Sequence, residues 1–354
     1  METRWVKLRQ VQTPSSVICE AGEIIRRGGL VAFPTETVYG LGGDALNPES
    51  SAKIYQAKGR PSDNPLIVHI CCMEDLAPIV KEIPPSAKIL ADAFWPGPLT
   101  MIFQKSVRVP CETTGGLDTV AVRFPRNETA LALIREAGGY IAAPSANTSG
   151  RPSPTEGKYV YEDLSGRIEM ILDDGLADIG LESTIVDMTE EIPVILRPGY
   201  ITEEMIEKVL GKVNADPTLL SVAANVAPKA PGMKYKHYAP KGDLTIVAGS
   251  QGDVVTRINN LAREARTQGK KVGVIGTDET ISFYRTQVRK SVGSRVDEAS
   301  IARRLYQILR EFDDEKVDVI YSESFDDTGI GQAIMNRLLK AAGHNVLHVE
   351  DEQI

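Results

Sequence analysis

Lys58 and Arg60 lie on either side of Gly59, and Asn64 follows them in the segment KGRPSDNPL (58–66). An ammonium group is a compact positive charge, and a guanidinium group is a planar fork that matches pairs of phosphate oxygens. These residue types at this spacing predict a binding site for an anionic group such as a phosphate. Two cations that only complement the carbonyl end of a helix would give the same pattern, and the segment alone leaves both interpretations open.

Two other segments are rich in groups that donate hydrogen bonds. PTETVYGLG (34–42) combines hydroxyls with glycine backbone, and APSANTSGRPSPT (143–155) follows a predicted strand, although turn chemistry also explains both compositions. Arg123 and Arg197 each end a predicted strand, where α/β proteins place ligand contacts. Together these segments predict a pocket of cations and hydroxyls that suits a nucleotide or another anionic substrate. Its hydroxyl and amide members are Thr35, Thr37, Tyr39, Ser145, Asn147, Thr148, Ser149 and Ser153.

The elements that must position these segments can be predicted from apolar periodicity. Apolar residues from Val17 to Ile25 recur at helical spacing up to Gly28, and Asn47-Pro48 predicts a second helix that stops near Gly59. Further helices are expected near 74–81, 86–94 and 127–137. Strands are expected at 30–33, 66–70, 99–103, 119–124, 140–143, 169–172, 183–188 and 193–197. Because strands and helices alternate irregularly, the pattern predicts an α/β domain on a mixed sheet over residues 1–211.

The organisation changes after residue 211. Residues 212–242 are rich in proline and show little periodicity, which predicts an interdomain linker. Beyond it, strands expected at 244–249, 271–277, 317–322 and 346–349 alternate with helices expected at 252–267, 298–312 and 330–342. That alternation predicts a smaller Rossmann-like parallel sheet over residues 243–354.

The composition is typical of a globular protein of the cytoplasm. Hydrophobic residues make up 42% of the 354 residues and charged residues 25%, and this length favours two domains. No apolar leader and no run of eighteen apolar residues is present, so neither secretion nor a membrane span is expected. The net charge of −8 argues against a protein that as a whole attracts nucleic acid or an anionic membrane. Reduced thiols are expected, because the four cysteines form no C-x-x-C pair and the neighbours Cys71 and Cys72 are poorly placed to bridge each other.

Several catalytic motifs are absent from the sequence. It contains no G-x-x-x-x-G-K-[ST], which excludes a P-loop ATPase, and no G-x-S-x-G nucleophile elbow. Gly329-Ile-Gly331 lacks the third glycine of the dinucleotide motif, so a tight turn is favoured over cofactor binding there. The four histidines show no zinc spacing, and no metal ligand is predicted.

The motifs occur in a definite order: PTETVYGLG, the K-x-R of Lys58 and Arg60, the S-x-N of Ser145 and Asn147, STIVD (183–187) and LRPG (196–199). In this order they resemble the YrdC-type threonylcarbamoyl-AMP synthases. PGMKYKHYAP (231–240) and TGIGQAIMNRLLKAA (328–342) are similar to the long, two-domain members, so the resemblance covers essentially the whole chain. It implies an α/β fold: a YrdC-like twisted, mixed, open sheet with helices, and a smaller C-terminal Rossmann-like α/β domain.

The resemblance implies an enzyme that combines L-threonine, bicarbonate and ATP into L-threonylcarbamoyl-adenylate and releases pyrophosphate. A separate tRNA threonylcarbamoyl transferase would then modify the adenosine beside the anticodon of certain tRNAs. The threonine amine gives a carbamate, which attacks the α-phosphate, so catalysis should rest on positioning and electrostatic stabilisation. Mg²⁺ is the expected cofactor with ATP, held by phosphates and water rather than by protein, and no organic cofactor is expected.

The resemblance also implies roles for individual residues. The catalytic set would be Lys58, Arg60, Ser145 and Asn147. The threonine-binding set would be Thr37, His69, Arg123, Ala143 and Ser183. The ATP-binding set would be Arg60, Asn64, Thr119, Ser145, Ser153, Arg197, Tyr235 and His237. We further expect the linker 212–242 to act as a lid that protects the labile carbamate and adenylate from water.

Two alternative functions are consistent with parts of this pattern. A carbamoyl-adenylate-forming enzyme of the HypF type contains a related domain, but it also carries cysteine-rich zinc modules, for which this chain lacks the C-x-x-C pairs. A non-catalytic protein that binds double-stranded RNA or tRNA is the other alternative, because a basic pocket could serve either purpose. RNA binding through several phosphates weakens steeply with salt, whereas adenylate formation depends on threonine.

Overall fold

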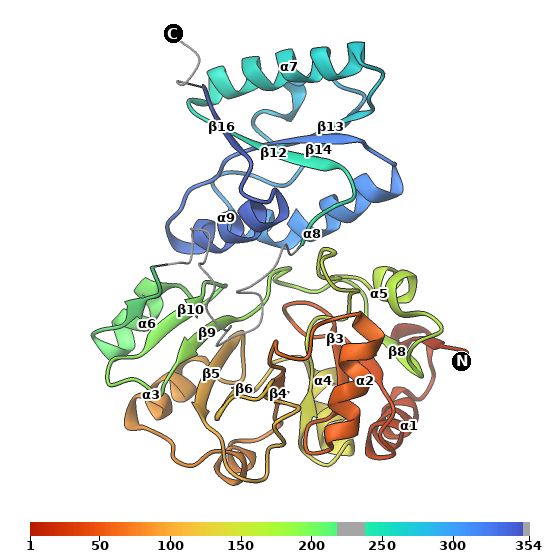
Figure 1. The fold of residues 1–354 in the computed structure, drawn as a ribbon, viewed down its shortest axis with the longest axis vertical. Helices are drawn as coiled ribbons and strands as arrows, with labels where there is room; N and C mark the ends of the chain where they lie inside the picture. Colours follow the sequence, from red (N-terminus) through yellow and green to blue (C-terminus); the bar gives the residue numbers. More distant parts are fainter. Residues whose placement is uncertain (218–237, 350–354) are drawn as a thin grey trace. The chain divides into compact units, whose positions relative to one another are not determined.

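A computed structural model describes residues 1–217 and 238–349 of the chain, which form two compact units (Figure 1). The first unit comprises residues 1–149 and 153–217, and the described part of the second comprises Gly150–Pro152 and residues 238–349. Most of the predicted linker 212–242, and with it the expected lid, lies outside the described residues. None of the described helices is long and apolar enough to cross a membrane.

The first unit is built on one mixed sheet. Its described strands, in spatial order, are β1 (Arg4–Lys7), β8 (Met170–Asp173), β2 (Val31–Phe33), β3 (Gly40–Asp44), β7 (Ile141–Ala142), β4 (Ile67–His69), β6 (Thr119–Arg123), β5 (Leu99–Gln104), β9 (Thr184–Asp187), β10 (Val194–Arg197) and β11 (Asn214–Ala215). β4 and β6 are parallel, whereas β7 and β5 pair with them in the antiparallel sense. The mixed, open sheet predicted from the sequence is therefore confirmed.

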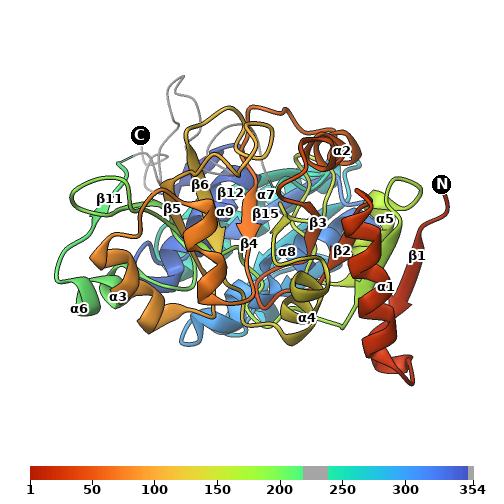
Figure 2. The same cartoon turned by 90° about the horizontal axis from the view of Figure 1, so that it is seen from below.

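Helices pack on both faces of this sheet. α1 (Pro14–Arg26) and α4 (Glu128–Glu136) pack side by side (Figure 2), and both contribute to one core with β1, β2 and β8. α2 (Pro48–Lys58), α3 (Pro85–Phe94), α5 (Gly157–Leu164) and α6 (Glu203–Leu210) contribute to the larger core on the other face. The alternation of side chains along β2 divides it between the two cores, with Val31 and Phe33 in the first and Ala32 in the second.

α2 carries Lys58 at its last position, and local sequence fixes both of its ends. The Asn47 side chain caps the start by accepting a hydrogen bond from the Glu49 amide at 3.0 Å, and Pro48 suits the first turn. Gly59 ends the helix in the left-handed region, with a φ of 61°, which glycine adopts without the steric penalty of other residues. The predicted helix from Asn47-Pro48 to Gly59 is confirmed, and Arg60 leaves it at a defined point.

The prediction of a helix near 74–81 is wrong. The structure has two single-turn 3₁₀ helices there, η2 (Met73–Asp75) and η3 (Ala77–Ile79). Pro78 has no amide hydrogen to donate, so a continuous helix would lose a hydrogen bond at this position. The prediction also missed β1, β3, α5 and α6. β3 has the sequence GLGGD, which has low strand propensity, and it forms because β2 and β7 pair with it on both sides.

The described part of the second unit contains an entirely parallel sheet. Its strands, in spatial order, are β14 (Val288–Ser291), β13 (Val272–Gly276), β15 (Val319–Glu323), β12 (Asp243–Ala248) and β16 (Val346–His348). α7 (Gln251–Thr267), α8 (Glu298–Asp314) and α9 (Gly329–Ala341) lie between these strands in sequence (Figure 1). The predicted Rossmann-like domain is confirmed. β14 was missed because its sequence, VRKS, is largely polar.

Three residues of the loop 143–155 belong to the second unit. Arg310 of α8 is fully buried and its Nε donates a hydrogen bond to the Pro152 carbonyl at 3.0 Å. Arg151 forms an ion pair with Asp313, one α8 turn further along, at 3.3 Å. The hydroxyl-rich loop thus leaves the first unit at Ser149, contributes three residues to the second unit, and returns at Ser153.

Candidate functional site

Four neighbouring strands of the first unit bring polar side chains to one edge of one sheet face. This face carries a small apolar cluster of Ile67, Ile102, Ala121, Ile185 and Leu196. Because side chains alternate along a strand, residues two positions away lie on the same face. Those residues are His69 on β4, Thr100 on β5, Arg123 on β6 and Ser183 just before β9. Strand pairing places His69 on one side of Arg123 and Thr100 on the other.

Arg123 is the charged centre of this edge and is only 4% exposed. Its Nη1 donates a hydrogen bond to Thr37 Oγ1 at 2.8 Å, and its Nη2 lies 2.7 Å from Glu36 Oε1. Nε and Nη2 of Arg123 and both carboxylate oxygens of Glu36 make no hydrogen bond within the described part of the chain. Buried polar atoms are nearly always hydrogen-bonded. These atoms therefore mark a place that suits a ligand carrying both a carboxylate and an amine.

The segment 34–42 uses most of its hydroxyls to hold its own shape. The Thr35 hydroxyl donates to the Val38 carbonyl at 2.6 Å and lies 2.9 Å from Thr37 Oγ1. The Tyr39 hydroxyl donates to the Gly175 carbonyl at 2.6 Å, and burial raises the pKa of that phenol. Of the three hydroxyls in this segment, that of Thr37 accepts a hydrogen bond from Arg123.

His69 is buried and uncharged. Burial, followed by the positive charge of Arg123, lowers the pKa of His69 to about 3. One ring nitrogen, Nδ1, lies 3.1 Å from the Ile67 carbonyl, to which a neutral Nδ1–H donates. The ring meets Phe33 edge-on at 6.1 Å between centroids. Arg123 is therefore the cation of this pair of adjacent residues, and His69 offers a neutral polar surface beside it.

Ser183 connects the predicted threonine-binding and ATP-binding sets. Its hydroxyl lies 2.7 Å from Thr100 Oγ1, and Arg197 donates to its carbonyl from Nε at 3.1 Å and to its hydroxyl from Nη2 at 3.2 Å. Gly199 permits this approach of two chain segments, because a Cβ there would lie 2.4 Å from the Thr184 amide nitrogen. The glycine of LRPG thus has a steric role beside the site.

Lys58 is buried, and its ammonium holds the S-x-N loop. Lys58 Nζ donates to the Ser145 carbonyl at 2.5 Å and also to the Asn147 carbonyl. Within the loop, the Ser145 hydroxyl donates to Asn147 Oδ1 at 2.5 Å. The four residues predicted as catalytic include these three, and the structure brings the three into direct contact. It also shows that Lys58 anchors the loop through backbone carbonyls, which the sequence did not indicate.

Arg60 and Asn64 lie in one turn after α2. Nη2 of Arg60 donates to the carbonyls of Asn64 at 3.1 Å and of Pro65 at 3.0 Å. The Asn64 side chain is buried, and its Oδ1 has no hydrogen-bond partner among the described residues. Thr119 begins β6 whereas Arg123 ends it, so the two lie about 13 Å apart along the strand at the usual rise per residue.

The remaining predicted residues differ in what they contact. The Ser153 hydroxyl is buried and donates to Glu182 Oε1 at 2.6 Å. The Ala143 amide donates to the Ile67 carbonyl at 2.9 Å, so this amide is used within the sheet. Tyr235 and His237, predicted for ATP, lie outside the described residues.

Sequence reasoning missed three polar residues that the structure places among these. Glu36 pairs with Arg123, Thr100 contacts Ser183, and Glu182 accepts from Ser153. The sequence does contain one indication of Thr100, which is a polar residue inside the apolar run LTMIF (99–103). Glu36 and Glu182 carry no such signal, because an acidic residue in a loop is usually solvated.

Two family models match the chain. One, described as "Telomere recombination" and covering the Sua5, YciO and YrdC proteins, matches residues 23–199. The other, described as "Threonylcarbamoyl-AMP synthase, C-terminal domain", matches residues 201–343.

Similar proteins are known along nearly the full length. The threonylcarbamoyl-AMP synthase of Pyrococcus abyssi is 50% identical over 332 residues, which cover 93% of this chain and 95% of that protein. That of Bacillus subtilis is 49% identical over 339 residues, which cover 96% of each. Among solved structures, P. abyssi Sua5 complexed with L-threonine matches with a TM-score of 0.91 at 46% identity, covering 98% of this chain and 99% of that one.

Proposed function

The chain belongs to the threonylcarbamoyl-AMP synthase family, in its two-domain form, and from this premise we propose how its residues share the reaction. The enzyme joins L-threonine, bicarbonate and ATP into L-threonylcarbamoyl-AMP and releases pyrophosphate, for threonylcarbamoyladenosine synthesis beside the tRNA anticodon. The observation that carries this conclusion is 50% identity over 93% of the chain to a protein of that activity. The buried Arg123 and Glu36 support it, because they suit an amino acid.

Arg123 is the residue that receives the threonine carboxylate in this proposal. Its Nε makes no hydrogen bond within the described residues and its Nη2 has only the ion pair with Glu36, and a guanidinium binds a carboxylate through two such donors. Thr37 holds the guanidinium in place through Nη1. His69, kept neutral by burial and Arg123, adds no second charge that would compete for the carboxylate.

Glu36 is positioned to receive the threonine amine. Its carboxylate is buried, lies 2.7 Å from Arg123 Nη2, and makes no hydrogen bond to other described residues. An ammonium cannot attack carbon dioxide or bicarbonate, so the amine must first lose a proton, and a neighbouring carboxylate can take it. The carbamate that forms then attacks the α-phosphate of ATP, and the bond to pyrophosphate breaks.

The ATP side of the site is proposed to lie around the loop 145–153. Lys58 fixes the carbonyls of Ser145 and Asn147, which sets the positions of the loop's hydroxyls and amides. Arg60 and Arg197 supply guanidinium groups for phosphate oxygens. Mg²⁺ is proposed to accompany ATP, held by phosphates and water, and these cations and hydroxyls suit such a complex. When bound, the ion neutralises charge on the phosphates.

The product is proposed to pass to a tRNA threonylcarbamoyl transferase, since an adenylate is a reactive carrier of its acyl group. Direct binding of tRNA or double-stranded RNA by this chain is a further proposal, which the net charge of −8 does not favour. The cytoplasm is the proposed compartment, because ATP and tRNA are found there.

Pyrophosphate release tests the proposed function. With ATP present, release is expected only when both threonine and bicarbonate are supplied, because the carbamate is the nucleophile. The assay omits each substrate in turn and identifies threonylcarbamoyl-AMP by mass spectrometry. Release that continues without threonine and without bicarbonate would contradict the assignment, and release that needs bicarbonate but not threonine would contradict the carbamate as nucleophile, because bicarbonate itself would then attack the α-phosphate.

Replacement of Arg310 tests whether residues 150–152 influence ATP binding. Arg310→Met leaves the Pro152 carbonyl without this buried donor, and we expect the second unit to lose about 1–3 kcal/mol of stability. Because Ser153 follows Pro152 directly, the KM for ATP should rise while the KM for threonine changes little. Arg303→Met, an exposed position on the same helix, is the matched control. An unchanged KM for ATP would show that residues 150–152 do not influence the nucleotide.

A further inference from the structure

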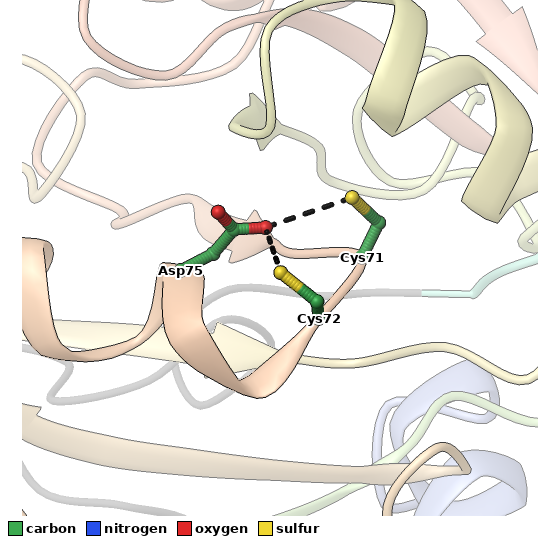
Figure 3. A group of neighbouring side chains, drawn as sticks. All are labelled: Cys71, Cys72 and Asp75. Atoms are coloured by element: carbon green, nitrogen blue, oxygen red, sulfur yellow. Dashed lines mark hydrogen bonds between the residues drawn. The ribbon is translucent and has the colours of Figure 1, made fainter.

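Cys71, Cys72 and Asp75 gather at the turn that follows β4 (Figure 3). Both thiols donate to the same carboxylate oxygen: Asp75 Oδ2 lies 3.6 Å from Cys71 Sγ and 3.1 Å from Cys72 Sγ. The three potential ligand atoms lie within 4.8 Å of one another and are half-buried. In residues 1–217 and 238–349, no other set of three histidine, cysteine or acidic side chains brings its ligand atoms this close. The reaction proposed above uses none of the three.

Local backbone structure is sufficient to build this cluster. The Ile70 amide donates to the Arg123 carbonyl at 2.9 Å, which fixes the chain as it leaves β4. Cys72 then precedes the single-turn helix η2 (Met73–Asp75). Residues three apart in a 3₁₀ helix lie above one another, so the turn carries Asp75 back over Cys72. The arrangement thus comes from five consecutive residues anchored to the central sheet.

The charges around the sulfur atoms favour a cation. The negative groups that act on the two thiols are Asp75 and Glu74, and Arg135 is the positive one. Burial followed by Asp75 raises the pKa of Cys71 to about 11, and the hydrogen bond to Asp75 raises the pKa of Cys72. Both thiols are therefore protonated at neutral pH when no cation is bound. A divalent cation reverses this preference, because its charge stabilises coordinated thiolates.

We propose that Cys71, Cys72 and Asp75 bind a thiophilic divalent cation of the Zn²⁺ type, through two thiolates and one carboxylate oxygen. A tetrahedral zinc ion with Zn–S near 2.3 Å and Zn–O near 2.1 Å places sulfur and oxygen about 3.5 Å apart, close to the two distances found here. Binding releases the two thiol protons, and water completes the coordination. Thiolate ligands distinguish this site from Mg²⁺, which prefers oxygen ligands.

Co²⁺ is the probe for the site, because it replaces Zn²⁺ and its absorption reports thiolate ligands. The reduced, full-length protein is expected to bind one Co²⁺ per chain with thiolate-to-cobalt absorption, which Zn²⁺ then removes. Loss of a residue that only hydrogen-bonds a metal ligand weakens metal binding by about 10–100-fold. Removal of a direct ligand should have a larger effect, and this is expected of each of three variants: Cys71→Ser, Cys72→Ser and Asp75→Asn. Cys19→Ser and Cys111→Ser remove exposed thiols elsewhere and should leave binding unchanged.

Alkylation of the unmodified protein provides a second measurement that needs no variant. Zn²⁺ should protect Cys71 and Cys72 from iodoacetamide while Cys19 and Cys111 stay reactive, as peptide mass spectrometry would show. Three results would overturn the proposal: no thiolate-to-cobalt absorption, absorption lost in Cys111→Ser and kept in Cys71→Ser, or equal alkylation of all four cysteines with and without Zn²⁺.

Discussion

Arg123→Met is expected to weaken threonine-dependent pyrophosphate release strongly and to lower the free energy of unfolding by about 3–5 kcal/mol. The stability loss follows because Glu36, 2% exposed, would keep its charge in a buried place without the cation 2.7 Å away. The activity loss follows because two charge-assisted hydrogen bonds to the substrate carboxylate, each worth about 1.5–3 kcal/mol, disappear. The loss of these two hydrogen bonds corresponds to at least about a 100-fold rise in the KM for threonine.

The double variant Glu36→Gln/Arg123→Met separates the structural role from the substrate-binding role. It leaves no uncompensated charge buried, so most of the stability should return, whereas methionine still cannot bind a carboxylate. Urea denaturation followed by tryptophan fluorescence measures the first unit alone, since Trp5 and Trp95, the two tryptophans of the chain, both belong to it. Activity that returns together with stability would contradict both proposed roles in the reaction, that of Arg123 in binding the carboxylate and that of Glu36 in accepting the amine proton.

Lys58→Ala is expected to lower kcat/KM for ATP by about 10²–10³, the effect of losing one preorganised donor at a reacting centre. Lys58 is 3% exposed and bonds the carbonyls of Ser145 and Asn147, so its loss releases the loop that carries the predicted nucleotide contacts. Steady-state kinetics with varied ATP and saturating threonine measure this effect.

Lys53→Ala is the matched control for Lys58→Ala. Lys53 lies on the same helix and also bonds a backbone carbonyl, that of Gly28 at 2.6 Å, but it is exposed and on another side of the helix. Near-normal kinetics are expected for this variant. If Lys58→Ala were as active as Lys53→Ala, the S-x-N loop would keep its shape without the Lys58 ammonium. The proposed catalytic role of Lys58 would then be wrong.

Local patterns predicted most of the individual elements. Helical periodicity from Val17 to Ile25 and the Asn47-Pro48 start of α2 depend on residues near in sequence, and both helices are found where expected. The errors are also local in origin. η2 and η3 replace the helix predicted near 74–81 because of Pro78, and β3 was missed because GLGGD becomes a strand only through its pairing with β2 and β7.

The sequence by itself determined which residue types are present and in which order the family motifs occur. These are the two cations of K-x-R, the hydroxyl and amide of S-x-N, and the arginines at two strand ends, Arg123 and Arg197. Only the tertiary structure decided what these side chains contact. Glu36 reaches Arg123, Thr100 reaches Ser183, and the Lys58 ammonium bonds a loop 87 residues away. The physical reason is that periodicity is a property of a short segment, whereas strand register joins segments far apart in the chain. The register of β4, β5 and β6 places His69, Arg123 and Thr100 side by side, and no local pattern contains that register.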